Sequence, residues 1–172
     1  YFSLLESLMS PKDLVAQAVN QGVRTLGMTD HLYLTGAIEF SQSCFKAGIK
    51  PIIGLEINLS YQGYSGLMTL IAENQSGWEN LSRLSSYMLV NETEITTSEL
   101  EAHRDGLIGI SGESRGILTS LIKSGLSRHN LPDQFLEVLG DIFNKNLFIE
   151  IQRSPNGPLP HEQTLLALAE NH

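Results

Sequence analysis

The stretch VRTLGMTDHLYLTGAIEFSQSCFKAGIKPIIGLE, residues 23–56, decides the fold. It holds two short apolar runs, residues 23–28 and 51–55, and between them residues 37–47 carry apolar side chains at helical spacing and end before Gly48. This order predicts two parallel strands joined by a crossover helix. We expect the first strand to be buried and to end in the polar residues 29–31, and the second to end at Glu56.

Helices flank this unit, and their ends are marked in the sequence. Ser10 is a suitable N-cap, Pro11 suits the first helical position, and Gly22 follows the expected end. Spacing predicts a buried stripe on this helix made of Leu14, Val15, Ala18 and Val19. On the helix of residues 37–47 the predicted core residues are Ile38, Phe40, Cys44 and Phe45.

The rest of the chain continues the alternation of strands and helices. Residues 57–61 and 67–72 are expected to form a hairpin, and residues 107–110 and 147–151 two further strands. Helices are predicted over residues 77–87, 115–123 and 132–143, over 98–103 with Ser98 as cap, and from about His161 onward. Residues 90–97 are read as a polar connection. The pattern predicts one α/β domain over residues 1–172.

Composition excludes several classes of protein. The chain has 172 residues, of which 41% are hydrophobic, so it is expected to fold around a core of its own. The single cysteine, Cys44, rules out an internal disulfide framework and suits a reducing compartment such as the cytoplasm. No apolar run is long enough for a membrane span. The net charge of −8 argues against a nucleic-acid-binding surface.

Polar groups follow the apolar strands at comparable places: His31, Glu56, Glu113 and residues 152–154. Because functional groups gather at the C-terminal ends of parallel strands, a shared pocket is expected there. Imidazole and carboxylate groups suit a divalent metal such as Zn²⁺ or Mn²⁺. The alternative is that Glu56 and Glu113 are solvated or cap the next helix. Asp30 should point to the face opposite His31 and act as a cap or a partner of a ligand.

These residues belong to longer segments that resemble a known family. The segments are FSLLE at 2–6, MTDH at 28–31, GAIEF at 36–40, AGIKPIIGLE at 47–56, AENQSGWENLSRLS at 72–85, GLIGISG at 106–112 and LFIEIQR at 147–153. Together they resemble the PHP (polymerase and histidinol phosphatase) domain, in the version found at the N-terminus of bacterial DNA polymerase III alpha subunits. The resemblance covers nearly the whole chain.

The resemblance implies a distorted seven-stranded β/α barrel, similar to a TIM barrel, with a metal cluster at the C-terminal strand ends. The family's metal ligands correspond here to Glu6, His31, Glu56 and Glu113. Two further ligand histidines fall at Leu67 and Ser154. A His-x-His pair would precede Tyr1 and an Asp-x-His motif would follow His172, so the chain is expected to be a fragment of the domain that lacks its first and last strands.

Leu67 cannot coordinate a metal and Ser154 is a poor ligand, so the ligand set is depleted. A metal-dependent phosphoesterase needs two or three closely spaced metals, which demands a dense set of ligands. We therefore expect at most a single, weakly bound divalent metal (Zn²⁺, Mn²⁺ or Mg²⁺) and no efficient hydrolysis.

Two functions remain open at this point. The resemblance implies a structural and docking module within a DNA-directed DNA polymerase, in contact with the rest of the alpha subunit and with a proofreading exonuclease; Mg²⁺-dependent nucleotidyl transfer would reside elsewhere in the parent chain. The alternative is a metal-dependent phosphoesterase, either a 3′–5′ proofreading exonuclease or a pyrophosphatase.

Overall fold

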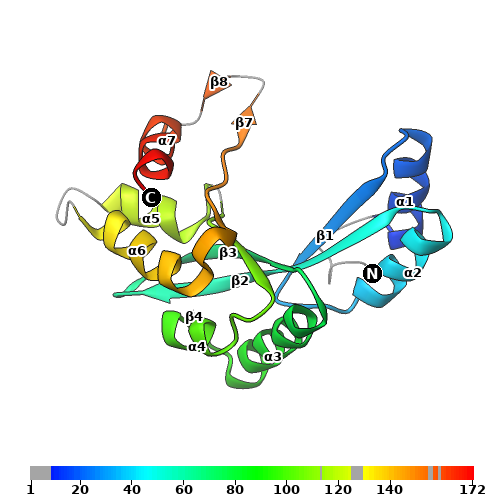
Figure 1. Cartoon of the computed structure of the whole chain (residues 1–172), viewed down its shortest axis with the longest axis horizontal. Helices are drawn as coiled ribbons and strands as arrows, with labels where there is room; N and C mark the ends of the chain where they lie inside the picture. Colours follow the sequence, from blue (N-terminus) through cyan, green and yellow to red (C-terminus); the bar gives the residue numbers. More distant parts are fainter. Residues whose placement is uncertain (1–8, 113, 125–129, 155–156, 159) are drawn as a thin grey trace.

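The computed structural model describes residues 9–112, 114–124, 130–154, 157–158 and 160–172. In these ranges the chain is an α/β fold built on one mixed sheet of six strands, in the order β1-β2-β3-β5-β6 with β4 beside β2 (Figure 1). The strands are β1 (Thr25–His31), β2 (Lys50–Tyr61), β3 (Tyr64–Ala72), β4 (Ile95–Thr96), β5 (Leu107–Ile110) and β6 (Leu147–Phe148). A separate small ribbon pairs β7 (Arg153–Ser154) with β8 (Gly157–Pro158).

Strand directions confirm the parallel unit that the sequence predicts. β1 and β2 run parallel over their whole pairing, from Thr25 beside Lys50 to His31 beside Glu56. β2 and β3 form the expected hairpin, whose two-residue turn is left-handed at both Gln62 and Gly63. β3 is antiparallel to both β2 and β5, whereas β5 and β6 are parallel. β3 is therefore the reversed strand of the main sheet.

The helices are α1 (Pro11–Asn20), α2 (Ala37–Lys46), α3 (Gln75–Asn91), α4 (Thr97–Ala102), α5 (Ile117–Ser124), α6 (Leu131–Phe143) and α7 (Glu162–Asn171), and a short 3₁₀ turn (Asn144–Asn146) follows α6. Ser10 caps α1 as predicted, because its Oγ accepts a hydrogen bond from the Asp13 backbone N–H at 3.1 Å. The cap predicted for α4 is wrong: Thr96, not Ser98, caps it in a capping box with Glu99. The reason is that β4 keeps the chain extended up to Thr96, within the segment read as a connection.

The two faces of β2 differ in chemistry, and this positions the candidate site. Leu55, Ile57 and Leu59 are fully buried, and they join the main core with residues of β3, α3, α5 and α6. The alternating residues Glu56 and Asn58 point to the opposite face and are partly exposed. β2 therefore runs through Glu56 rather than ending there as predicted, and it presents polar side chains in mid-strand.

Several predicted core residues are exposed. Val19, Ile38 and Phe45 are 48%, 64% and 70% exposed. α2 packs against α1 and against β2, and these contacts bury Ala37, Phe40 and Cys44. The second apolar stripe of α2, Ile38 and Phe45, stays uncovered. The stripe borders an open groove of about 540 Å³ between α2 and α3.

Two of the strand predictions are also wrong. The expected buried strand, β1, is an end strand in the described sheet and is only partly covered. The strand predicted over residues 147–151 is shortened to two residues, because pairing with β5 stops at Phe148.

Candidate functional site

The candidate site lies on the polar face of the sheet, where β1 ends beside the middle of β2. His31 and Glu56 are register partners on these parallel strands. The His31 Nε2 atom lies 3.4 Å from Oδ1 of Asn58, two residues beyond Glu56 on the same face of β2. The structure therefore brings together two of the residues that the sequence predicts as metal ligands.

Each of these two side chains already has a protein partner. Asn58 Oδ1 can only accept a hydrogen bond, so the contact with His31 requires the tautomer that carries the proton on Nε2. In that tautomer Nε2 has no lone pair to offer a metal, and the ring nitrogen that can act as a ligand is Nδ1. The Glu56 carboxylate lies 3.8 Å from the Arg115 guanidinium, in an ion pair whose side chains are 24% and 77% exposed.

The backbone of Arg115 is held where its side chain can reach Glu56. The Leu67 N–H donates a hydrogen bond to the Arg115 carbonyl at 2.9 Å, and Gly116 bridges to Leu67. Gly112 allows this approach, since a β-carbon there would lie 2.6 Å from the Leu67 carbonyl, and its φ of +69° favours glycine. Gly112, Arg115 and Gly116 are thereby held against Leu67 of β3.

Leu67 occupies the position at which the resemblance implies a ligand histidine. It is the register partner of Asn58, so its side chain lies on the same face as His31 and Glu56. It is only 9% exposed and carries no ligand atom. The site is thus apolar where a metal centre of this type would have an imidazole.

A strained turn sets the position of His31. Leu32, the next residue, has φ +65°, a conformation that a leucine rarely adopts. The Leu32 N–H donates to the Glu56 carbonyl at 2.9 Å, and the Ser85 hydroxyl donates to the Leu32 carbonyl. Contacts with β2 and α3 therefore hold the chain as it leaves the sheet, directly after the candidate ligand.

The other predicted site residues are placed in part. Glu6 and Glu113 lie outside the described residues, and Ser154 is placed only as a backbone position in β7. Asp30 alternates with His31 on β1 and, as expected, points the other way, toward the start of α2. Its Oδ2 lies beside Gly36, the N-cap of α2, where an added β-carbon would be 3.6 Å from it. Its role as a partner of a ligand stays a prediction.

We tested whether the residues in place suit the metal cluster that the resemblance implies. Over the described ranges, no three histidine, cysteine, aspartate or glutamate side chains gather as a metal site would require. With Arg115 on Glu56 and Leu67 at a ligand position, the placed residues do not fit a centre of two or three metals.

Sequence reasoning missed three residues of this site: Asn58, Arg115 and Leu32. The alternation of β2 could have indicated Asn58, because it follows Glu56 by two positions on the same face. No local signal points to Arg115, which is 59 positions from Glu56 in the sequence and meets it only through the turn after β5. Left-handed backbone at a leucine has no sequence signature either.

The chain is similar in sequence to parts of several DNA polymerases. It is 28% identical to DNA polymerase III subunit alpha of Rickettsia bellii over 95% of this chain and 14% of that protein. It is 31% identical to the corresponding subunit of Borreliella burgdorferi over 88% of this chain and 14% of that protein. An error-prone DNA polymerase of Symbiobacterium thermophilum is 33% identical over 72% of this chain and 13% of its own length. The chain therefore spans about a seventh of the curated relatives that it matches.

The fold is similar to that of a Bifidobacterium adolescentis protein described as a metal-dependent phosphoesterase, with a TM-score of 0.64 and 14% identity over 97% of this chain and 80% of that one. No helix in the described ranges is long and apolar enough to cross a membrane. The family model of the PHP domain matches residues 1–154. With nearly nine-tenths of its length matched by this model, the chain belongs to the PHP domain family.

Proposed function

We propose that the chain is the PHP domain of a replicative DNA polymerase of the DNA polymerase III alpha type, where it acts as a structural and docking module rather than as an efficient phosphoesterase. In this proposal it supports the polymerase body and offers a surface to a proofreading exonuclease in the cytoplasm. The complete domain would be a seven-stranded β/α barrel of which this chain forms the larger part. Its polymerase relatives and its acidic charge, which suits protein contacts better than DNA contacts, support this function.

One observation carries the proposal: the chain's own groups engage the two placed candidate ligands. A hydrolytic metal centre needs deprotonated, available ligands that surround each metal. Here a guanidinium faces Glu56 and Leu67 fills a ligand position. The Asn58 amide oxygen faces Nε2 of His31, so that Nδ1 is the ring nitrogen that can act as a ligand. Any metal that binds would be single and weakly held, by His31 and Glu56 together with Glu6 and Glu113.

The competing function is a metal-dependent phosphoesterase, as a 3′–5′ exonuclease or a pyrophosphatase. The observation that favours it is the adjacency of His31 and Glu56 on one face at the end of β1. Under this alternative, Arg115 would have to leave Glu56 when the metal binds. The two functions therefore make different demands on His31: a phosphoesterase needs it as a metal ligand, whereas a docking module does not need it.

The test measures metal content by emission spectrometry and phosphoesterase turnover in added Mn²⁺ or Zn²⁺, for the wild type and for His31→Ala. His103→Ala is the matched control, because His103 lies at the end of α4 and its ring contacts the Glu99 carbonyl. We expect no significant turnover in any of the three proteins, and equal capture of the exonuclease subunit by all of them. Two or more tightly bound metals, with turnover lost in His31→Ala and kept in His103→Ala, would establish the phosphoesterase instead.

A further inference from the structure

The groove between α2 and α3, called here the α2–α3 groove, is apolar and shares no lining residue with the site at His31 and Glu56. Its floor includes Pro51 and Ile53 of β2, and its walls include Ile38, Phe45 and Trp78. Ile38 and Phe45 are mostly exposed and lie seven positions apart on one side of α2, which is two helical turns or about 10.5 Å. Its volume of about 540 Å³ leaves room for several apolar side chains from another molecule.

Three cations border the end of the groove at which α2 stops and β2 begins. Lys46 directly follows Phe45 of the wall. Lys50 directly precedes Pro51 of the floor, and its N–H donates a hydrogen bond to the Arg24 carbonyl at 2.9 Å. Arg24, Lys46 and Lys50 are exposed, and none of them forms an ion pair within the described part of the chain.

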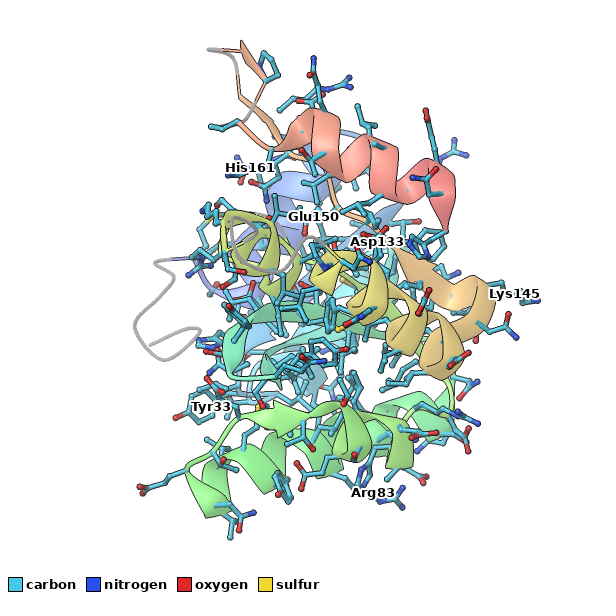
Figure 2. All side chains as sticks on the ribbon, turned by 90° about the vertical axis from the view of Figure 1, so that its left-hand side faces the viewer. Tyr33, Arg83, Asp133, Lys145, Glu150 and His161 are labelled. Carbon is cyan, nitrogen blue, oxygen red and sulfur yellow. The ribbon has the colours of Figure 1, made fainter. Side chains whose placement is uncertain are left out.

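This grouping stands out in a chain whose net charge is −8. In the described ranges the other lysines and arginines without an ion pair are Lys123 on α5 and Lys145, which Figure 2 labels at the outer edge of the molecule. Glu73 is the one ionisable side chain among the described residues that line the groove, and it accepts a hydrogen bond from Asn146 Nδ2 at 3.5 Å. The apolar groove therefore ends in a local positive patch.

We propose that the α2–α3 groove docks an acidic amphipathic helix of a partner protein, with apolar side chains in the groove and carboxylates at Arg24, Lys46 and Lys50. A helix suits the gap, because α2 and α3 cover this face of the sheet and a third helix between them would extend the same layer. Helix-in-groove recognition uses apolar anchors on successive turns, which matches the two-turn stripe on α2. Carboxylates complement the three unpaired cations. The inference does not depend on the proposed polymerase role.

Charge disfavours two other occupants of the same surface. A second copy that binds through this surface would bring two sets of three cations together, which is a like-charge contact. A nucleic-acid strand could place only about three phosphates on the patch, and beyond it the strand would meet a chain that is otherwise strongly acidic. The aliphatic residues Ile38, Pro51 and Ile53 also suit apolar side chains better than flat bases.

The test uses fluorescence anisotropy with a fluorescein-labelled helical peptide that carries leucines at i, i+4 and i+7 and glutamates beside the first leucine. We expect saturable binding to the wild-type chain that weakens as the salt concentration is raised. The control peptide has lysines in place of the glutamates and should not saturate. Absence of saturable binding by the acidic peptide, or equal binding of the two peptides, would overturn the proposal.

Two variants locate the binding surface, and both change exposed side chains, so the fold should be kept. Lys46→Glu should weaken the acidic peptide by about 2- to 25-fold, because an exposed ion pair gives a factor of about 1.4–5 and charge reversal replaces attraction with repulsion. Phe45→Ala should weaken it by at least about 5-fold through the loss of an aromatic anchor. The matched controls are Lys123→Glu on α5 and Val90→Ala, at an 80% exposed residue of α3. Unchanged affinity in Phe45→Ala or Lys46→Glu, or equal losses in the controls, would refute the assignment.

Two further measurements check the other occupants. Sedimentation velocity should show a wild-type monomer, and a dimer that is lost in Phe45→Ala would assign the surface to a second copy instead. Unlabelled oligo-dT should not displace the acidic peptide, and displacement that is lost in Lys46→Glu would assign the surface to single-stranded DNA. Either of these results would overturn the proposal of a protein partner.

Discussion

Replacing Arg115 with methionine is expected to make the His31–Glu56 site bind divalent metal more tightly. The guanidinium lies 3.8 Å from the Glu56 carboxylate, where two unit charges attract by ~1 kcal/mol in water and by ~4 kcal/mol at an effective dielectric constant of 20. Because the Arg115 side chain is 77% exposed, solvent screening brings the net value into the range of exposed pairs, about 0.2–1 kcal/mol. That energy corresponds to a factor of about 1.4–5 in an equilibrium constant.

The assay is a competition titration with Zn²⁺ or Mn²⁺ against a chromophoric chelator, at low ionic strength. Arg115→Met should lower the Kd by up to about 5-fold, whereas Arg115→Lys should stay near the wild type because it keeps the charge. Arg83→Met is the control, since Arg83 makes the same 3.8 Å contact with Glu79 on the exposed side of α3. An unchanged Kd in Arg115→Met, or an equal decrease in Arg83→Met, would refute the reasoning.

Three further predictions follow from the same structure. Leu67→His should lower the free energy of unfolding by about 1–3 kcal/mol, measured in urea, because it buries a polar ring, and added Zn²⁺ should restore part of the loss by binding beside Glu56. Gly112→Ala should cost at least about 1–3 kcal/mol, measured the same way, because its φ is +69° and the new methyl would meet the Leu67 carbonyl; an unchanged stability would contradict the placement of this turn. Burial raises the pKa of the Cys44 thiol above its ordinary value of 9.0, because the folded state favours the neutral thiol. The contribution of the buried neutral thiol to the free energy of unfolding is therefore complete below pH 9.0 and is lost as the pH rises through the raised pKa. Iodoacetamide at pH 8 should accordingly label native protein much more slowly than urea-unfolded protein, and similar rates would show that Cys44 is accessible.

Local signals in the sequence were enough for the elements whose ends depend on neighbouring residues. Ser10 and Pro11 start α1 as predicted, because capping is a contact over three residues. The parallel pair β1 and β2 and the hairpin after β2 were also predictable, since hydrophobic period and glycine placement determine them. His31 and Glu56 lie side by side because they are register partners on parallel strands, although β2 continues beyond Glu56 instead of ending there as predicted.

Only the tertiary structure decided which faces are covered and which side chains meet across the sheet. Spacing on α2 marks two apolar stripes, and packing against α1 and β2 buries Phe40 but leaves Phe45 exposed. The partner of Glu56 was hidden for the same reason: Arg115 reaches it through a turn fixed against Leu67 on another strand. Periodicity and capping act over a few residues, whereas burial and ion pairing here depend on contacts between segments far apart in the chain. The sequence therefore determined most of the elements and the family, and the tertiary structure decided that the candidate ligands face a guanidinium and an amide.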